Sequence, residues 1–207
     1  MSVLFSVLLL LVVIACVGFT FTEGLWSNLI RFVNVVAAAT IATNYWEPLA
    51  NQLESMYKAG TYFWDFTALW LIFGVSVLVL QLATSALSQV KVKFLTLMDH
   101  IGSALFGALT GLALLCFLAM TLHTAPLAEK FFGGAFDYSH GIMFGMSPDR
   151  MWCGYMQTVS GGAFAQSPPS PFDPGNAFMG RYAARRAEVE KLAGEGKSLQ
   201  NENPPPR

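Results

Sequence analysis

The sequence has few charged residues. Only 12% of its 207 residues are Asp, Glu, Lys or Arg, against roughly 25% in a typical soluble domain. The formal net charge is −1, which excludes the basic surface that a nucleic-acid-binding protein needs. The charges are also unevenly placed, because only four basic and five acidic residues precede His123. An apolar block followed by a polar tail is typical of an integral membrane protein with an appendage outside the membrane.

The residues and motifs of common catalytic and metal sites are equally scarce. The three cysteines, Cys16, Cys116 and Cys153, are too few and too far apart for a disulfide framework or a metal site. The three histidines are also dispersed, and the sequence has no HExxH, GxSxG, P-loop or GxGxxG motif. We therefore predict that the protein is not an enzyme and that it binds no metal or cofactor.

Four apolar runs are each long enough to cross a membrane. A helix rises ~1.5 Å per residue, so about 20 residues span a hydrocarbon core of ~30 Å. The predicted spans are residues 2–22, 25–44, 62–84 and 101–123. A signal peptide is the alternative for the first run, but no Lys or Arg precedes it, so a retained spanning helix is favoured. The predicted fold is all-α: a four-helix transmembrane bundle followed by a carboxyl-terminal tail.

Tryptophan residues predict the membrane interfaces, where the amphipathic indole is favoured. The predicted interface anchors are Trp26, Trp46, Trp64 and Trp152. The first two enclose the second run and lie about 30 Å apart along a helix. Pro48, which lacks an N–H group, is expected to end that helix. Apolar residues at helical spacing within 47–60 then predict a segment that lies along the interface.

Lysine and arginine residues near the span ends indicate the orientation. In a four-span chain, the loop at residues 85–100 lies on one side of the membrane and both termini lie on the other. The first side carries Arg31, Lys91 and Lys93, and the second carries Lys58 and Lys130. Because basic residues favour the cytoplasmic side, this count predicts that both termini are non-cytoplasmic.

The tail is predicted to contain two amphipathic helices. Its segments are an aromatic and glycine-rich stretch at 126–166 with a helix at 148–160, a proline-rich linker at 167–175, a basic helix at 176–193, and a disordered end at 194–207. The linker holds four of the ten prolines, which favours a stiff spacer. The apolar face of the first tail helix predicts that it lies on the membrane surface or packs over the bundle.

A strip of small residues runs along the fourth span. Ser103, Gly107 and Gly111 recur every four residues, and Ala104 and Ala108 widen the strip. Small side chains at this spacing let a second helix backbone approach closely, which drives helix association in lipid. The strip therefore predicts a helix–helix contact, either within this chain or with another subunit.

Arg31 is the one charged residue well inside a predicted span. It follows Trp26 by five residues, which places it about 7–8 Å deeper along the helix. Asn34 lies on the same face, and the candidate ionic partners are Glu23 and Asp99. Arg31 either reaches the headgroups or pairs structurally, or it lines a polar pathway; the first interpretation is favoured.

The start of the fourth span resembles a known family. Residues 97–111 (LMDHIGSALFGALTG) resemble the Leu-Asp-Arg and repeated-glycine segment of the colicin V production protein family, and the resemblance covers about residues 1–125. The family-like positions are Asp99, Gly102, Gly107 and Gly111. His100 and Thr110 depart from the pattern, because the family often has arginine there. The resemblance implies an inner-membrane protein linked to colicin V biosynthesis or secretion, with no known reaction.

Two functions are consistent with these patterns. The first is a membrane scaffold or accessory factor that acts by helix association, with the lipid bilayer and further copies or other membrane proteins as partners. The second is a pore or transporter subunit lined by Arg31, Asn34 and a carboxylate on the same side. A transporter usually repeats its spans or places polar residues at the bilayer midplane. Apart from the Arg31 stripe, the sequence has neither feature, which favours the scaffold.

Overall fold

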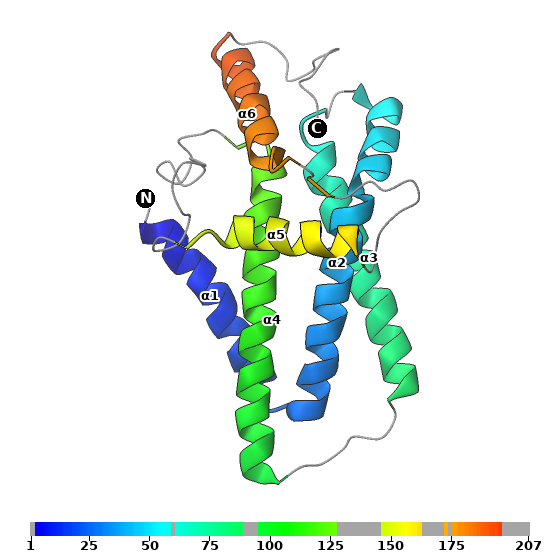
Figure 1. Ribbon diagram of the computed structural model, residues 1–207, viewed down its shortest axis with the longest axis vertical. Helices are drawn as coiled ribbons and strands as arrows, with labels where there is room; N and C mark the ends of the chain where they lie inside the picture. The colour runs from blue at the N-terminus through cyan, green and yellow to red at the C-terminus, as the bar shows by residue number, and fades with distance from the viewer. Residues whose placement is uncertain are drawn as a thin grey trace.

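The computed structural model describes residues 3–58, 61–88, 95–127, 146–162, 172–173 and 175–195. Figure 1 shows that the regular structure within these ranges is helical, which confirms the predicted all-α class. The helices are α1 (Val3–Thr20), α2 (Leu25–Met56), α3 (Trp64–Leu87), α4 (Thr96–Thr124), α5 (Pro148–Gly161) and α6 (Phe178–Gly194).

Three of these helices are long and apolar enough to cross a membrane. They are α2, α3 and α4, with 32, 24 and 29 residues, and even α3 measures about 36 Å at the helical rise. The apolar helical stretch Ser6–Thr20 of α1 is shorter than these three helices. The chain is therefore a multi-pass membrane protein with a helical bundle, while a fourth crossing by α1 stays a prediction.

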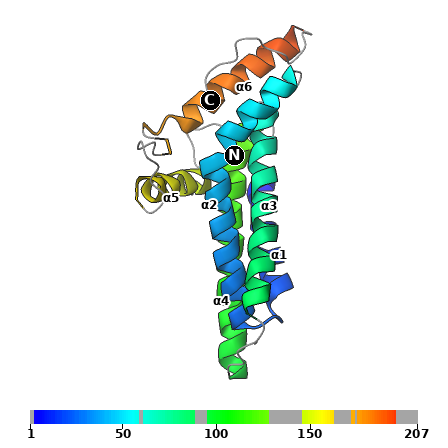
Figure 2. The same cartoon turned by 90° about the vertical axis from the view of Figure 1, so that its right-hand side faces the viewer.

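The bundle has a central pair of helices with one helix on each flank. Successive helices run in opposite directions, and α4 lies between α1 and α2 in Figure 1, while α3 packs against α2 on the far side. The start of α2, the end of α3 and the start of α4 lie at one end of the bundle. The tail helices lie at and near the opposite end, where α5 runs across the bundle and α6 covers the end of α4 (Figure 2).

Pro48 does not end the second helix, contrary to the prediction. α2 continues through Pro48 to Met56, so the first ten residues of the predicted interfacial segment 47–60 belong to α2. Proline costs one backbone hydrogen bond and pushes the preceding turn aside, so a helix can bend at it instead of ending. Figures 1 and 2 show the upper part of α2 turning away from the line of its lower part. Leu49 and Leu53 pack against the core beyond the bend, which compensates for the lost bond.

An aromatic cluster fills the interior of the bundle on the side where α5 packs. Trp70 and Phe73 of α3 meet Phe117 of α4 with ring centroids 5.8 and 4.9 Å apart, and Trp152 of α5 lies 5.6 Å from Phe117. These separations are within the favourable range for aromatic pairs, each worth about 0.5–1.5 kcal/mol beyond its buried area. The cluster joins three helices that are distant in the sequence.

Two of the four predicted interface anchors are wrong. Trp46 and Trp152 are only 2% and 4% exposed, so their indoles do not face lipid headgroups. α6 covers Trp46 through Tyr182, and the Trp152 indole N–H donates to Thr43 Oγ1 at 3.1 Å. Trp26 and Trp64 are half-buried, and their role as anchors stays a prediction.

The tail helices form close to their predicted bounds. α5 corresponds to the helix predicted at 148–160. It packs over α4 and α2, which was one of its two predicted positions. α6 corresponds to the helix predicted at 176–193. Several parts of the predicted tail lie outside the described residues. They are 128–145 and 163–166 of segment 126–166, most of linker 167–175, and the predicted disordered end beyond residue 195.

Candidate functional site

The amino-terminus of α2 is joined to the first turn of α4. The Leu25 backbone N–H donates to Asp99 Oδ1 at 2.7 Å. A carboxylate at this position satisfies a backbone donor that the helix leaves without a partner and interacts favourably with the helix dipole. Asp99 was a candidate ionic partner of Arg31, and that prediction is wrong because Asp99 instead caps α2.

Two glycines make room for this joint. Gly24 has φ +86°, a conformation that favours glycine, and a Cβ there would lie 3.1 Å from Asp99 Oδ2. A Cβ on Gly102 would lie 2.0 Å from Leu25 Cδ1, so the Leu25 side chain occupies the space that a larger residue would need. Asp99 and Gly102 therefore act together in positioning the turn that links α1 to α2.

The small-residue strip of α4 packs against α1 of the same chain. A Cβ on Gly111 would lie 2.8 Å from Val13 Cα, and one on Gly107 would lie 2.5 Å from Thr20 Oγ1. Ser103 continues the strip and is fully buried, while Ala104 and Ala108 are half-buried beside it.

This contact decides between the two partners that the sequence left open for the strip. At Gly111 the α1 backbone itself approaches so closely that it takes the place of a side chain. The strip is therefore occupied by a helix of this chain in this structure.

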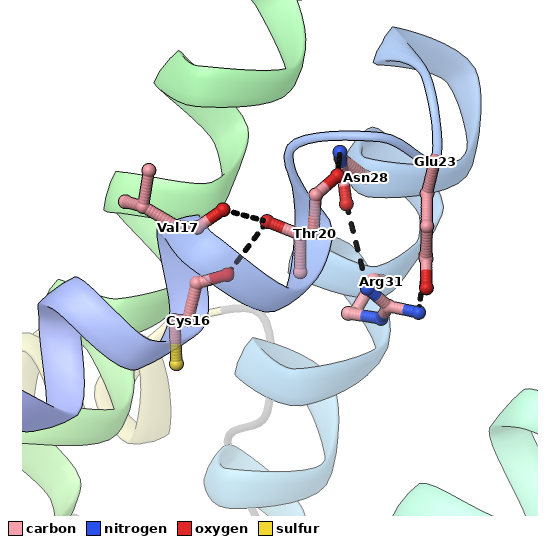
Figure 3. Close-up of polar contacts among 6 residues, drawn as sticks. All are labelled: Cys16, Val17, Thr20, Glu23, Asn28 and Arg31. Atoms are coloured by element: carbon pink, nitrogen blue, oxygen red, sulfur yellow. Dashed lines mark hydrogen bonds and ion pairs between the residues drawn. The ribbon is translucent and has the colours of Figure 1, made fainter.

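The turn between α1 and α2 holds a compact polar cluster (Figure 3). The buried Asn28 side chain donates to the Thr20 carbonyl at 2.8 Å, and its Oδ1 lies 3.5 Å from Nη1 of Arg31. Arg31 forms an ion pair with Glu23, which confirms one of its two predicted partners. These side chains are 35% and 40% exposed, so the pair is accessible from outside the bundle.

This ion pair lines a groove between α2 and α3 with a volume of about 330 Å³. Two hydrogen bonds cross the groove: the Trp26 indole N–H donates to Ser88 Oγ, and the Asn34 amide donates to Thr84 Oγ1, both at 2.9 Å. The structure thus brings Glu23, Arg31 and Asn34 together, as the polar stripe predicted. We call this site the α2–α3 groove.

A second polar cluster lies near the opposite end of the bundle and holds α6. Tyr182 donates to Asp65 Oδ2 at 3.0 Å, and Arg185 Nη2 lies 3.5 Å from the same oxygen. The Arg185 and Asp65 side chains are only 5% and 1% exposed. The Arg185 guanidinium also lies over the Tyr62 ring, 5.4 Å from its centroid, a cation–π geometry.

A buried histidine connects three helices beside this pair. His123 Nε2 lies 3.0 Å from Asp149 Oδ2, and Arg186 Nη1 lies 3.1 Å from His123 Nδ1. Because a guanidinium only donates, Nδ1 is the acceptor, and the ring proton is on Nε2 and directed at Asp149. We call Asp65, His123, Asp149, Arg185 and Arg186 the ionic layer.

Sequence reasoning did not predict the ionic layer. The cluster of arginines in 176–193 was visible, but Asp65, which pairs with Arg185, lies 120 residues earlier in the chain. Arg186 is connected to Asp149 only through His123. The only signal of the ionic layer in the sequence was that Asp65 and Asp149 are isolated acidic residues at helix starts, near aromatic residues. Among the residues that the structure describes, no group of three His, Cys, Asp or Glu side chains could hold a metal ion. The absence of a metal and of a cofactor stays a prediction.

Long apolar helices with polar groups concentrated at helix joints define a helical membrane protein of the multi-pass class. Within that class, the family model described as colicin V production protein matches residues 5–145. The chain therefore belongs to the colicin V production protein family, as the resemblance indicated. The match extends over α1 to α4 and ends before α5. No curated protein and no solved structure matches the chain.

Proposed function

We propose that this chain is a non-enzymatic scaffold of the inner membrane that supports colicin V biosynthesis or secretion. In this proposal the bundle anchors the protein, and α5 and α6 form a fixed platform to which another protein of the process binds. The observation that carries the proposal is the ionic layer, because it joins a polar tail helix to the membrane bundle.

The physical cost of buried charge supports this interpretation. A buried charged side chain is tolerated only when it is paired, and removing one partner of a buried pair typically costs about 3–5 kcal/mol. Arg185 has such a partner in Asp65, and Arg186 donates a hydrogen bond to His123 of α4. Both contacts favour one position of α6 relative to the bundle. A fixed position suits a binding platform better than a mobile tether.

The outward face of α6 has the shape for a helical partner. Gly180, Ala184 and Ala187 are exposed at a spacing that places them on one face, with Lys191 one turn further. Small side chains on an exposed helix face allow another helix to approach closely.

Colicin V secretion tests the proposal. In producing cells whose only copy is the variant, Ala184→Trp should reduce the colicin V released into the medium while the protein stays in the membrane. Leu78→Trp is the matched control, because Leu78 is an exposed apolar residue of α3. Normal release by Ala184→Trp would contradict the platform.

We also propose that both termini are on the non-cytoplasmic side. The support is the distribution of Lys and Arg at the span ends, together with the placement of both tail helices away from the 88–95 end of the bundle. A reporter enzyme that is active only outside the cytoplasm, fused after residue 207, should be active. If a reporter that is active only in the cytoplasm is active at the same position, the termini are cytoplasmic and the proposed orientation is wrong.

A pore or transporter subunit is the second candidate function, favoured by the α2–α3 groove and its polar lining. The aromatic cluster that packs the bundle interior towards the other end argues against a path through one chain. Flux in liposomes separates the two proposals. Solute flux that is lost in Arg31→Ala would favour the transporter, and no flux with the parent protein would exclude it.

A further inference from the structure

We propose that the α2–α3 groove binds a zwitterionic phospholipid whose headgroup carries a primary ammonium group, such as phosphatidylethanolamine. This proposal goes beyond the scaffold function and does not depend on it. It rests on the charges of the groove, on the order of its polar and apolar residues, and on its accessibility.

The polarity of the groove follows the long axis of a phospholipid. Glu23 and Ser88 lie at the end of the bundle where α2 begins and α3 ends, and Arg31 and Asn34 follow about two to three turns further in. Val35 and Val77 line the deeper part of the groove. A ligand that is polar at one end and apolar at the other matches this order, which favours a lipid over a soluble solute.

The charges of the lining favour a zwitterion. Among the lining residues that the structure describes, Glu23 and Arg31 are the charged ones, and together they carry no net charge. A phosphate accepts hydrogen bonds from a guanidinium, and an ammonium donates to a carboxylate. A headgroup with both groups next to each other can therefore bind beside the Glu23–Arg31 pair without leaving an uncompensated charge in a region of low dielectric constant.

The same pair distinguishes between headgroups. A choline headgroup has no N–H to donate to Glu23, although its phosphate can still bind Arg31. A glycerol headgroup leaves a net negative charge next to the Glu23 carboxylate. Both charged side chains are partly exposed, so they can contact a lipid without first separating from a buried position.

Lipid retention by the purified full-length protein tests the proposal. The protein is incubated in detergent with equal amounts of ethanolamine, choline and glycerol phospholipids that share the same acyl chains, and the bound lipid is measured by native mass spectrometry. We expect about tenfold more bound ethanolamine lipid, since one charge-assisted hydrogen bond corresponds to roughly that ratio. Equal retention of the three lipids would overturn the proposal.

Two charge variants assign the contacts. Glu23→Gln should lower the preference for ethanolamine over choline towards one, because an amide does not neutralise the ammonium. Arg31→Gln should weaken the binding of both lipids, because they share the phosphate. Glu47→Gln and Lys58→Gln are the matched controls, since both residues are exposed outside the groove and should leave retention unchanged. An unchanged preference in Glu23→Gln would contradict the proposal.

A third variant keeps the test decisive if the charge variants fail to fold. Val77→Trp fills the apolar part of the groove without changing the ion pair, so it should reduce retention of the ethanolamine lipid about tenfold with unaltered helical content. Full retention in Val77→Trp would show that lipid binds elsewhere. Competition by soluble glycerophosphoethanolamine at the same concentration as the lipid would instead show a solute site and would also overturn the proposal.

Discussion

Substituting Gly111 by alanine should loosen the contact between α1 and α4. The new Cβ would lie 2.8 Å from Val13 Cα, whereas ordinary contact begins at 3.4 Å, so the α1 backbone must move by about 0.6 Å. Because both sides of the contact are helix backbone, no side chain can rotate away. Such overpacking typically costs about 1–3 kcal/mol, which exceeds the gain of up to about 1 kcal/mol in helix propensity from glycine to alanine.

A graded series makes this prediction specific to the close contact. Gly107→Ala should cost less, because the nearest atom to its Cβ is the Thr20 hydroxyl, which can rotate. Gly74→Ala is the control, since nothing lies within 4 Å of its Cβ on the exposed side of α3. The measurement is unfolding in mixed detergent micelles followed by circular dichroism. If Gly111→Ala is as stable as Gly74→Ala, the assignment of the strip to α1 is refuted.

Three other predictions concern the polar contacts. Asp99→Ala leaves the Leu25 N–H without its acceptor and should cost about 1–3 kcal/mol in the same unfolding assay, whereas Asp99→Asn keeps an acceptor and should cost less. Asp65→Asn removes the partner of Arg185 and should release α6, detected as faster proteolysis between α5 and α6; proteolysis at the parent rate would contradict the ionic layer. Burial and the nearby Asp149 and Asp173 carboxylates raise the pKa of the Cys153 thiol from 9.0 to about 12, so iodoacetamide at pH 8 should label it slowly in the folded protein and rapidly in dodecyl sulfate. Because this pKa is raised on folding, the stabilisation is complete below pH 9 and is lost as the pH rises towards 12, and unfolding that is independent of pH in that window would contradict it.

The membrane spans could be predicted from the sequence because their signal is local. A run of about 20 apolar residues needs no information from the rest of the chain, and α2 to α4 arise at the predicted places. The pairing of Arg31 with Glu23 was also predictable, since Glu23 lies in the connection just before α2 and Arg31 near the start of that helix. Predictions of this kind depend on neighbours in sequence.

The failures share a different origin, which is packing between distant segments. Nothing near Trp46 in the sequence indicates that Tyr182, 136 residues later, covers it. Trp152 is buried against Phe117 and Thr43, which are also distant in the sequence. Pro48 was expected to end a helix because of a local rule. Apolar contacts on both sides of the bend outweigh that rule in the folded chain.

The family-like positions have one physical explanation that composition alone could not provide. Asp99 binds the first N–H of α2, Gly102 makes room for Leu25, and Gly107 and Gly111 make room for α1. All four therefore contact one hairpin, made by α1, the turn at residues 21–24 and the start of α2. His100 belongs to the same joint, because its ring stacks on Phe21 of the turn with centroids 5.4 Å apart. The residue at which this chain departs from the family pattern therefore packs on the same hairpin as the four family-like positions.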